Sequence, residues 1–137
     1  MRSARLADSR GTCLALSVIE ERLAICRLDR EAEVPAWAAT APFCSVTRTP
    51  DELSVVCPER NIPPNMVCER GWRALKLEGP FDLALTGILV SVAAPLSEAG
   101  ISVFVVATYE TDYVLVRESQ LELAGSVLID RGHVVRR

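Results

Sequence analysis

Short apolar runs, each bounded by turn-forming residues, fill the first half of the chain. Their spacing predicts strands over residues 13–19, 22–28, 43–47 and 53–57. Glu20 and Glu21 are predicted to form the first turn, and the sequence Thr-Pro-Asp-Glu at 49–52 is predicted to form the second. A short helix around Trp37, with Pro35 in its first turn, is predicted between the two hairpins.

The second half alternates strands with longer amphipathic segments. Strands are predicted over 72–78, 101–107, 113–116 and 133–135. We expect 101–107 to be a central strand and 113–116 to be its antiparallel partner. Helices are predicted over 86–99, with Thr86 as N-cap and Gly100 after its end, and from residue 118 or 119 to Gly132. Pro95 is expected to kink or shorten the first helix. The order β-α-β-β-α-β is the ferredoxin-like plan, and the first half follows it with one helix missing.

Changes in composition suggest where the chain divides. Residues 1–12 form a polar lead-in, and the segment 59–71 is rich in proline and asparagine. We therefore predict a first unit with its linker over 13–70 and a second unit over 71–137.

Composition and charge exclude several classes of protein. The chain has 137 residues, half of them hydrophobic, and a net charge of −3 with acidic and basic residues interleaved. Nucleic-acid binding needs clustered Lys and Arg, which this pattern lacks. No apolar stretch reaches the roughly 18 residues of a membrane span, and we expect no signal peptide because the first nine residues are polar. We expect a cytoplasmic protein with neither nucleic-acid nor membrane partners.

The reactive residue types give little sign of an enzyme. The five cysteines form no Cys-x-x-Cys motif and are expected to be buried and reduced. His133 is the sole histidine and is expected at the surface or at a strand end, so neither a histidine metal pair nor a nucleophile–histidine system is indicated. No phosphate-binding or dinucleotide-binding glycine motif occurs, and no cofactor or metal is expected. An enzyme that uses only carboxylates stays open as an alternative.

Three stretches carry a family resemblance. They are residues 43–56, residues 71–80, and the segments 85–89, 99–102 and 108–116 taken together. They resemble ACT domains of the family related to the cytosolic arginine sensors of the TOR pathway. The resemblance implies an α+β fold of two ACT-like units with antiparallel sheets, the first unit incomplete. It also implies a non-catalytic regulatory protein that holds a free amino acid between two such units and forms a homodimer.

The chemistry of a zwitterion suggests where such a ligand binds. A helix start at Thr86, Gly87 and Ile88 offers backbone N–H groups to a carboxylate, and Gly87 permits close approach. Asp112, beside Thr111, offers a charge to an ammonium group. The resemblance adds a second wall on the strand 43–47. The predicted ligand-binding residues are Ser45, Val46, Thr47, Thr86, Gly87, Ile88, Thr111 and Asp112.

Simpler interpretations of the same residues stay open. Asp112 is equally a turn former, Gly87 a packing position, and Ser45 and Thr47 solvated strand positions. Trp37 and Trp72 are interpreted as core anchors. The alternative function is an interaction module that dimerises through a sheet edge and binds no small molecule.

Overall fold

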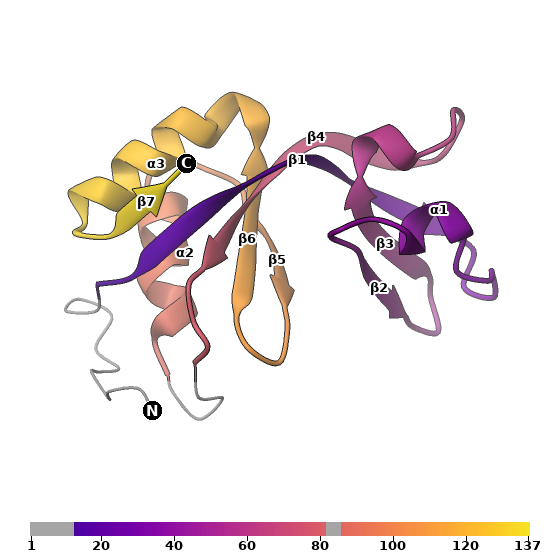
Figure 1. Ribbon diagram of the computed structural model, residues 1–137, viewed down its shortest axis with the longest axis horizontal. Coiled ribbons are helices and arrows are strands. Elements are labelled where there is room, and N and C mark those ends of the chain that lie inside the picture. Colours follow the sequence, from indigo (N-terminus) through magenta and orange to yellow (C-terminus); the bar gives the residue numbers. More distant parts are fainter. Residues whose placement is uncertain (1–12, 82–85) are drawn as a thin grey trace. The chain divides into compact units, whose positions relative to one another are not determined.

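The computed structural model describes residues 13–81 and 86–137. Within these ranges it has an α+β fold with seven strands, three α-helices and two short 3-10 helices (Figure 1). The strands are β1 Ala15–Leu28, β2 Ser45–Arg48, β3 Leu53–Pro58, β4 Cys68–Leu77, β5 Phe104–Ala107, β6 Asp112–Arg117 and β7 Val134–Arg136. The helices are α1 Ala36–Ala39, α2 Ile88–Glu98 and α3 Leu121–Asp130, and the 3-10 helices are Glu59–Asn61 and Glu118–Gln120. The predicted lead-in 1–12 lies outside the described residues.

The strands follow the order β2-β3-β1-β4-β6-β5, and β7 pairs with β1 beside this path. The pairs β1/β3, β2/β3 and β5/β6 are antiparallel, whereas β1/β7 is parallel. The predicted strand over 101–107 is therefore an edge strand and not a central one. It is also shorter than predicted, because it begins only at Phe104.

The prediction of a turn at Glu20 and Glu21 is wrong. β1 continues through both residues as one 14-residue strand. Its first part pairs with β7 at Ala15, and its last part pairs with β3 over 23–28. Different partners along its length explain why the strand does not fold back, since nothing in Glu-Glu forces a reversal of the chain.

The chain divides into two compact units, but not at the predicted boundary. Unit 2 comprises Glu21–Trp72, and unit 1 comprises 13–20 together with Arg73–Arg137. Residues 13–20, which were assigned to the first unit, thus belong with the C-terminal half. The reason is topological, because β1 takes the position beside β4 that the ferredoxin-like plan gives to its last strand. The predicted C-terminal strand is β7, which pairs outside β1 at the edge.

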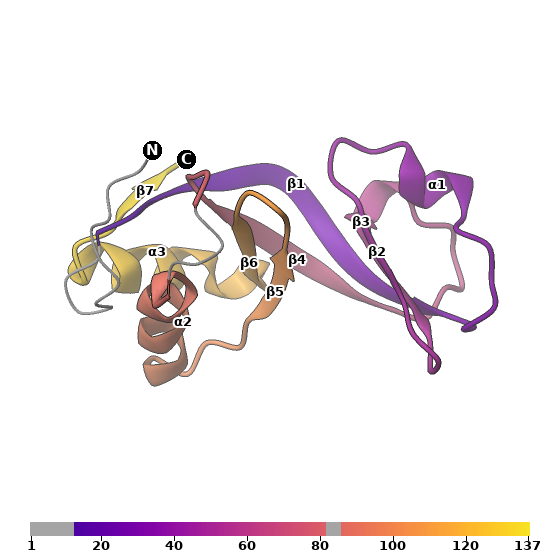
Figure 2. The ribbon, with the colours of Figure 1, turned by 90° about the horizontal axis from the view of Figure 1, so that it is seen from below.

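Each unit has its own hydrophobic core. In unit 1, α2 and α3 pack side by side against the strands (Figures 1 and 2). The fully buried side chains of this core are Leu16, Leu75, Leu77, Val92, Leu96, Val114, Val116, Ala124 and Leu128. Unit 2 has a smaller core around Ala24, Cys26, Ala38, Leu53, Val55 and Cys57. The described residues include no helix long and apolar enough to cross a membrane.

Helix α2 shows how local signals and tertiary contacts combine. Gly100 follows the helix with φ +79°, and its N–H bonds to the Ser97 carbonyl, as the sequence predicts for a C-terminal glycine. Pro95 does not end the helix, which continues to Glu98. Proline has no N–H, so the carbonyl of Ser91, four residues earlier, lacks its usual donor within the helix.

His133 supplies that missing donor. Its ring Nε2 lies 2.9 Å from the Ser91 carbonyl oxygen, and its Nδ1 accepts the N–H of Leu14 at 3.1 Å. An Nδ1 that accepts assigns the proton to Nε2, which then donates to Ser91. The ring is buried, so of the two expected positions the surface is wrong, whereas the strand end is confirmed because His133 directly precedes β7. Its two polar contacts join the start of β1 to α2, and neither contact is local in sequence.

The cysteines also differ from expectation. Cys26 and Cys57 are buried and Cys68 is half-buried, but Cys13 and Cys44 are exposed. All five are free thiols. The expectation of five buried cysteines is therefore confirmed only for two of them.

Candidate functional site

The end of β4, the start of α2 and the β5–β6 turn lie at the same end of unit 1 (Figure 1). The Phe81 N–H donates to the Glu110 carbonyl oxygen at 3.0 Å, which joins the segment after β4 to the turn. The sequence-predicted residues of the second half therefore gather at one end of one unit. Residues 82–85, which include Leu85 of the family resemblance, lie outside the described residues.

The β5–β6 turn is held together by its two threonines. The Thr108 N–H donates to the Thr111 carbonyl at 2.8 Å, and the Thr108 hydroxyl oxygen accepts the Thr111 N–H at 3.2 Å. The Thr111 hydroxyl donates to the Leu77 carbonyl at 2.6 Å and is buried. The Thr111 side chain therefore fastens the turn to β4. A contact between Thr111 and a ligand stays a prediction. Because the hydroxyl proton is already donated, the Thr111 oxygen could only accept a hydrogen bond from the ligand.

Asp112 is the charged group of this end. It begins β6, pairs with Ala107 across the hairpin and is half-buried. Burial raises the pKa of its carboxyl above the ordinary value of 3.8. Within 13–81 and 86–137, no hydrogen bond or ion pair engages this carboxylate. A partly desolvated carboxylate without a partner is stabilised by an added cation or ammonium group.

The start of α2 provides the opposite polarity. Gly87 is the N-cap residue, in the left-handed conformation with φ +82°, so the prediction that Thr86 caps the helix was wrong. Gly87 has no side chain with which to cap the helix. The first bond within the helix runs from the Ser91 N–H to the Gly87 carbonyl at 3.0 Å. The N–H groups of the first helical turn, before that of Ser91, have no acceptor within the helix. They point towards the helix start, where the helix dipole favours an anion.

The other two residues of this helix start have different environments. Thr86 is exposed, whereas the Ile88 side chain is half-buried against the core of unit 1. A ligand contact by Ile88 would therefore come from its backbone N–H and not from its side chain. The ligand roles of all three residues, 86–88, stay predictions.

Ser45, Val46 and Thr47 lie on β2 in unit 2. They face Val56, Val55 and Ser54 of β3 across the antiparallel pair. Ser45 is half-buried, and the other two are exposed at the end of the strand order. Their participation in a ligand site stays a prediction.

Sequence reasoning missed Glu78, a second carboxylate near the same end. It follows β4 directly and is half-buried, and its backbone N–H bonds to the Ala15 carbonyl at 2.8 Å. The Ser17 hydroxyl donates to its Oε2 at 2.5 Å. Nothing in the local sequence reveals this pair, because the two residues are far apart along the chain. Within the described residues, no group of three or more His, Cys, Asp or Glu side chains is arranged to hold a metal ion.

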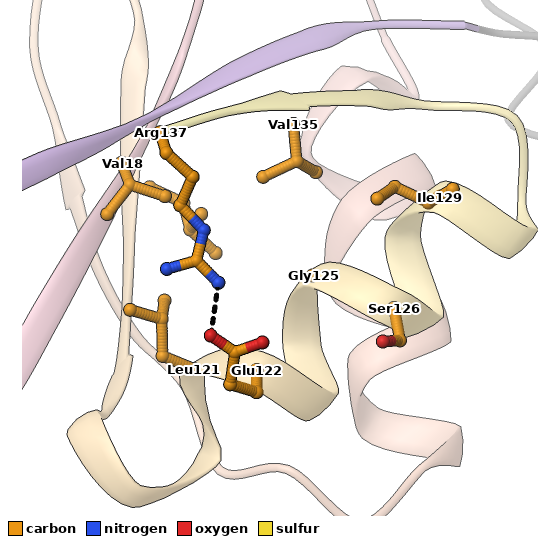
Figure 3. Close-up of a pocket in the computed structure, with 9 residues that line it drawn as sticks. Val18, Leu121, Glu122, Gly125, Ser126, Ile129, Val135 and Arg137 are labelled. Carbon is orange, nitrogen blue, oxygen red and sulfur yellow. Dashed lines mark hydrogen bonds and ion pairs between the residues drawn. The ribbon is translucent and has the colours of Figure 1, made fainter.

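A small cavity of about 110 Å³ lies elsewhere in unit 1, between α3 and the strands β1, β4 and β7 (Figure 3). Its walls include Val18, Leu121 and Val135, and an ion pair of 2.6 Å between Arg137 and Glu122 spans it. Sites for small molecules usually measure roughly 300–1,000 Å³. No predicted site residue lines this cavity, and its size does not suit a ligand site.

Family models match both halves of the chain. The model of the ACT domain matches residues 67–130, and a second model, described as an N-terminal domain, matches residues 21–65. The first match runs from the start of β4 to the end of α3. The second falls within unit 2.

Relatives and solved structures agree with these matches. The bovine (Bos taurus) cytosolic arginine sensor for mTORC1 subunit 1 is 30% identical over 135 residues, which cover 80% of this chain and 40% of that protein. This chain thus spans well under half of that curated relative. A crystal structure of an Agobacterium tumefaciens protein is 40% identical and covers 91% of this chain and 93% of its own, with a TM-score of 0.86.

More distant structures share the fold. The aspartate kinase of Clostridium acetobutylicum, described as an allosteric enzyme, is 11% identical over 88% of this chain and 35% of its own, with a TM-score of 0.64. A likeness this remote concerns the fold alone. The matching domain model and the curated relatives place the chain in the ACT domain family, among the proteins similar to the cytosolic arginine sensors.

Proposed function

We propose that this chain is a non-catalytic regulatory protein that binds a free amino acid at the end of unit 1 described above. Asp112 holds the ammonium group, and the N–H groups at the start of α2 hold the carboxylate. The ligand side chain then decides which amino acid binds. The name of the similar cytosolic arginine sensors gives arginine as what those proteins sense, which supports an amino acid as the ligand class here.

One observation carries this proposal. Asp112 is a half-buried carboxylate without a described partner, and it lies at the end of the unit where α2 begins with a glycine cap. Each feature is unfavourable alone, because burial opposes the charge on Asp112 and the helix start leaves N–H groups without acceptors inside the helix. A zwitterion compensates both features at once.

A non-catalytic role has separate support. The sole histidine, His133, is buried and uses both ring nitrogens to hold backbone groups. A general base must be within reach of a substrate proton, and this ring is committed to the core. Regulation follows if the ligand binds two states of the protein with different affinity.

The test is a thermal-shift screen of the twenty amino acids at millimolar concentration, followed by calorimetry of any hit. A ligand at 100 times its Kd stabilises the folded protein by about 2.7 kcal/mol. The N-acetylated form and the amide form of the hit should each lose affinity, because each removes one of the two charged ends. The absence of any hit would contradict the proposal.

Two matched variants locate the site. Asp112→Asn should weaken binding by roughly 10-fold or more, since a hydrogen bond to a charged group contributes about 1.5–3 kcal/mol. Glu110→Gln removes the same charge from an exposed residue of the same turn and should leave the affinity unchanged. Ser45→Ala and Thr47→Ala test the predicted contribution of β2. Equal losses in the Asp112 and Glu110 variants would indicate a general charge effect and not a contact.

The second candidate function is a sheet-edge interaction module, and the observation that favours it is the position of β5. This strand ends the strand order, and an edge strand presents backbone groups to another chain. Sedimentation analysis with and without the amino-acid hit separates the two functions. A cytoplasmic homodimer whose association changes with ligand fits the regulatory proposal, whereas a ligand-independent dimer with no hit in the screen fits the module.

A further inference from the structure

Three cysteine thiols meet in the core of unit 2. Cys26 and Cys57 are fully buried there, and Cys68 is half-buried and packs against the same cluster. The Cys26 thiol lies close enough to Cys57 and Cys68 for each to influence its pKa. The three residues come from β1, β3 and β4, so the cluster exists only in the folded unit.

Two neighbouring strands bring Cys26 and Cys68 close together. β1 and β4 are neighbours in the sheet, and the Arg27 N–H donates to the Val67 carbonyl at 3.0 Å. The other end of the pair joins Glu78 to Ala15, so the two strands are antiparallel. Cys26 and Cys68 are the next residues after the bond between Arg27 and Val67 on their two strands, and Cys68 packs against the core cluster that contains Cys26. Facing residues of neighbouring antiparallel strands have Cα atoms about 4.5–5.5 Å apart, within the roughly 4.4–6.8 Å that a disulfide spans.

Cys57 is less well placed. It faces Ala24 across β1 and β3, whereas Cys26 faces Val55. Cys26 and Cys57 are therefore diagonal neighbours, whose Cα atoms usually lie about 7–8 Å apart. A disulfide between them would need the backbone to move.

We propose that Cys26 and Cys68 are a thiol modification site that forms a reversible cross-strand disulfide by exchange with a low-molecular-weight disulfide such as oxidised glutathione. The Cys68 thiolate attacks the small disulfide, forms a mixed disulfide and releases one thiolate. The Cys26 thiolate then attacks the Cys68 sulfur and releases the second. Two protein thiols are oxidised, one small disulfide is reduced to two thiols, and the two protons pass to the leaving thiolates.

The surroundings of the three thiols set the order and the speed of these steps. Cys68 reacts first because it is the half-exposed member. Burial raises the pKa of Cys68, and the hydrogen bond to Cys57, together with burial, raises the pKa of Cys26. Both effects reduce the thiolate population, so exchange is slow near neutral pH and faster in mildly alkaline buffer. The proposal concerns unit 2 and does not rest on the amino-acid site.

The experiment equilibrates the intact chain with buffers of increasing oxidised-to-reduced glutathione ratio at pH 8. The remaining thiols are then alkylated and the peptides mapped by mass spectrometry. We expect a Cys26–Cys68 bridge in the wild type and in Cys57→Ala. Cys26→Ala should stop at glutathione on Cys68, and Cys68→Ala should leave Cys26 reduced. Cys44→Ala, which removes an exposed thiol of the same unit, serves as the control and should keep the bridge.

Three results would overturn the proposal. They are a wild-type chain in which Cys26 and Cys68 stay alkylatable while Cys13 and Cys44 oxidise, a Cys26–Cys57 bridge in its place, and glutathione that remains on wild-type Cys68 without resolving. Mapping of the wild type alone decides among these results, so the proposal stays testable even where an alanine variant fails to fold. Both tryptophans, Trp37 and Trp72, lie in unit 2. The unfolding midpoint that their fluorescence reports should therefore rise on oxidation and return to its starting value on reduction.

Discussion

The contact between His133 and Ser91 exists because of Pro95, and this dependence can be measured. His133→Ala removes the acceptor of the Leu14 N–H and the donor to the Ser91 carbonyl. Each buried backbone group left without a partner costs about 1–3 kcal/mol. We expect His133→Ala to lower the free energy of unfolding by about 3 kcal/mol and the Tm by roughly 10 °C, at about 2–4 °C per kcal/mol.

Pro95→Ala changes this cost. Alanine at 95 restores an N–H four residues after Ser91, so the Ser91 carbonyl gains a donor inside α2. In that background, His133→Ala leaves only the Leu14 N–H without a partner and should cost about 1.5 kcal/mol. The double-mutant cycle should therefore give a coupling energy of about 1.5 kcal/mol between residues 95 and 133.

Urea unfolding followed by far-UV circular dichroism measures this cycle. The two long helices, α2 and α3, lie in unit 1, so the helical signal follows the unit that contains His133. Val134→Ala, at an exposed neighbouring position, is the control and should change the stability by less than about 0.5 kcal/mol. Additive effects of Pro95→Ala and His133→Ala would refute the argument, because they would mean that the histidine does not replace the missing helix donor.

Three further predictions concern single sites. Because burial raises the pKa of Asp112 in the folded state, its contribution to stability is complete below the unfolded pKa and is lost as the pH rises through the folded pKa. Asp112→Asn should therefore be more stable than the wild type at pH 7, with an advantage that vanishes towards pH 3 in urea titrations, and a constant difference across pH would contradict the assignment. Gly100→Ala should cost about 1 kcal/mol in the same assay from backbone strain alone, since a Cβ there meets no atom within 4 Å. Leu128→Ala, in the core of unit 1, should cost about 2–5 kcal/mol, and a loss below 1 kcal/mol would mean that the helix packs more loosely than its full burial indicates.

Much of the candidate site could be predicted because its signals are local. Thr86, Gly87 and Ile88 lie where a helix begins, and Thr111 and Asp112 lie at a hairpin, as the pattern of the second half predicts. What the sequence could not reveal is the state of each group. The Thr111 hydroxyl is committed to the Leu77 carbonyl, and Glu78 is held by the distant Ser17. Both facts depend on which strands become neighbours.

The sequence by itself determined the elements that short-range chemistry controls. The turn at 49–52, the glycine after α2, the β5–β6 hairpin and the helix α3 all follow from residues within a few positions of each other. Backbone preferences and hydrophobic periodicity act at that range, so a single sequence contains enough information for them.

Only the tertiary structure decided how distant segments share a sheet. It joined the two predicted N-terminal strands into β1, placed residues 13–20 with the C-terminal half, buried His133 against Ser91 and packed Cys68 against the cluster that contains Cys26. In each case the partner lies far away along the chain. The choice among possible partners depends on the burial and hydrogen bonding of the whole unit, which no local pattern specifies.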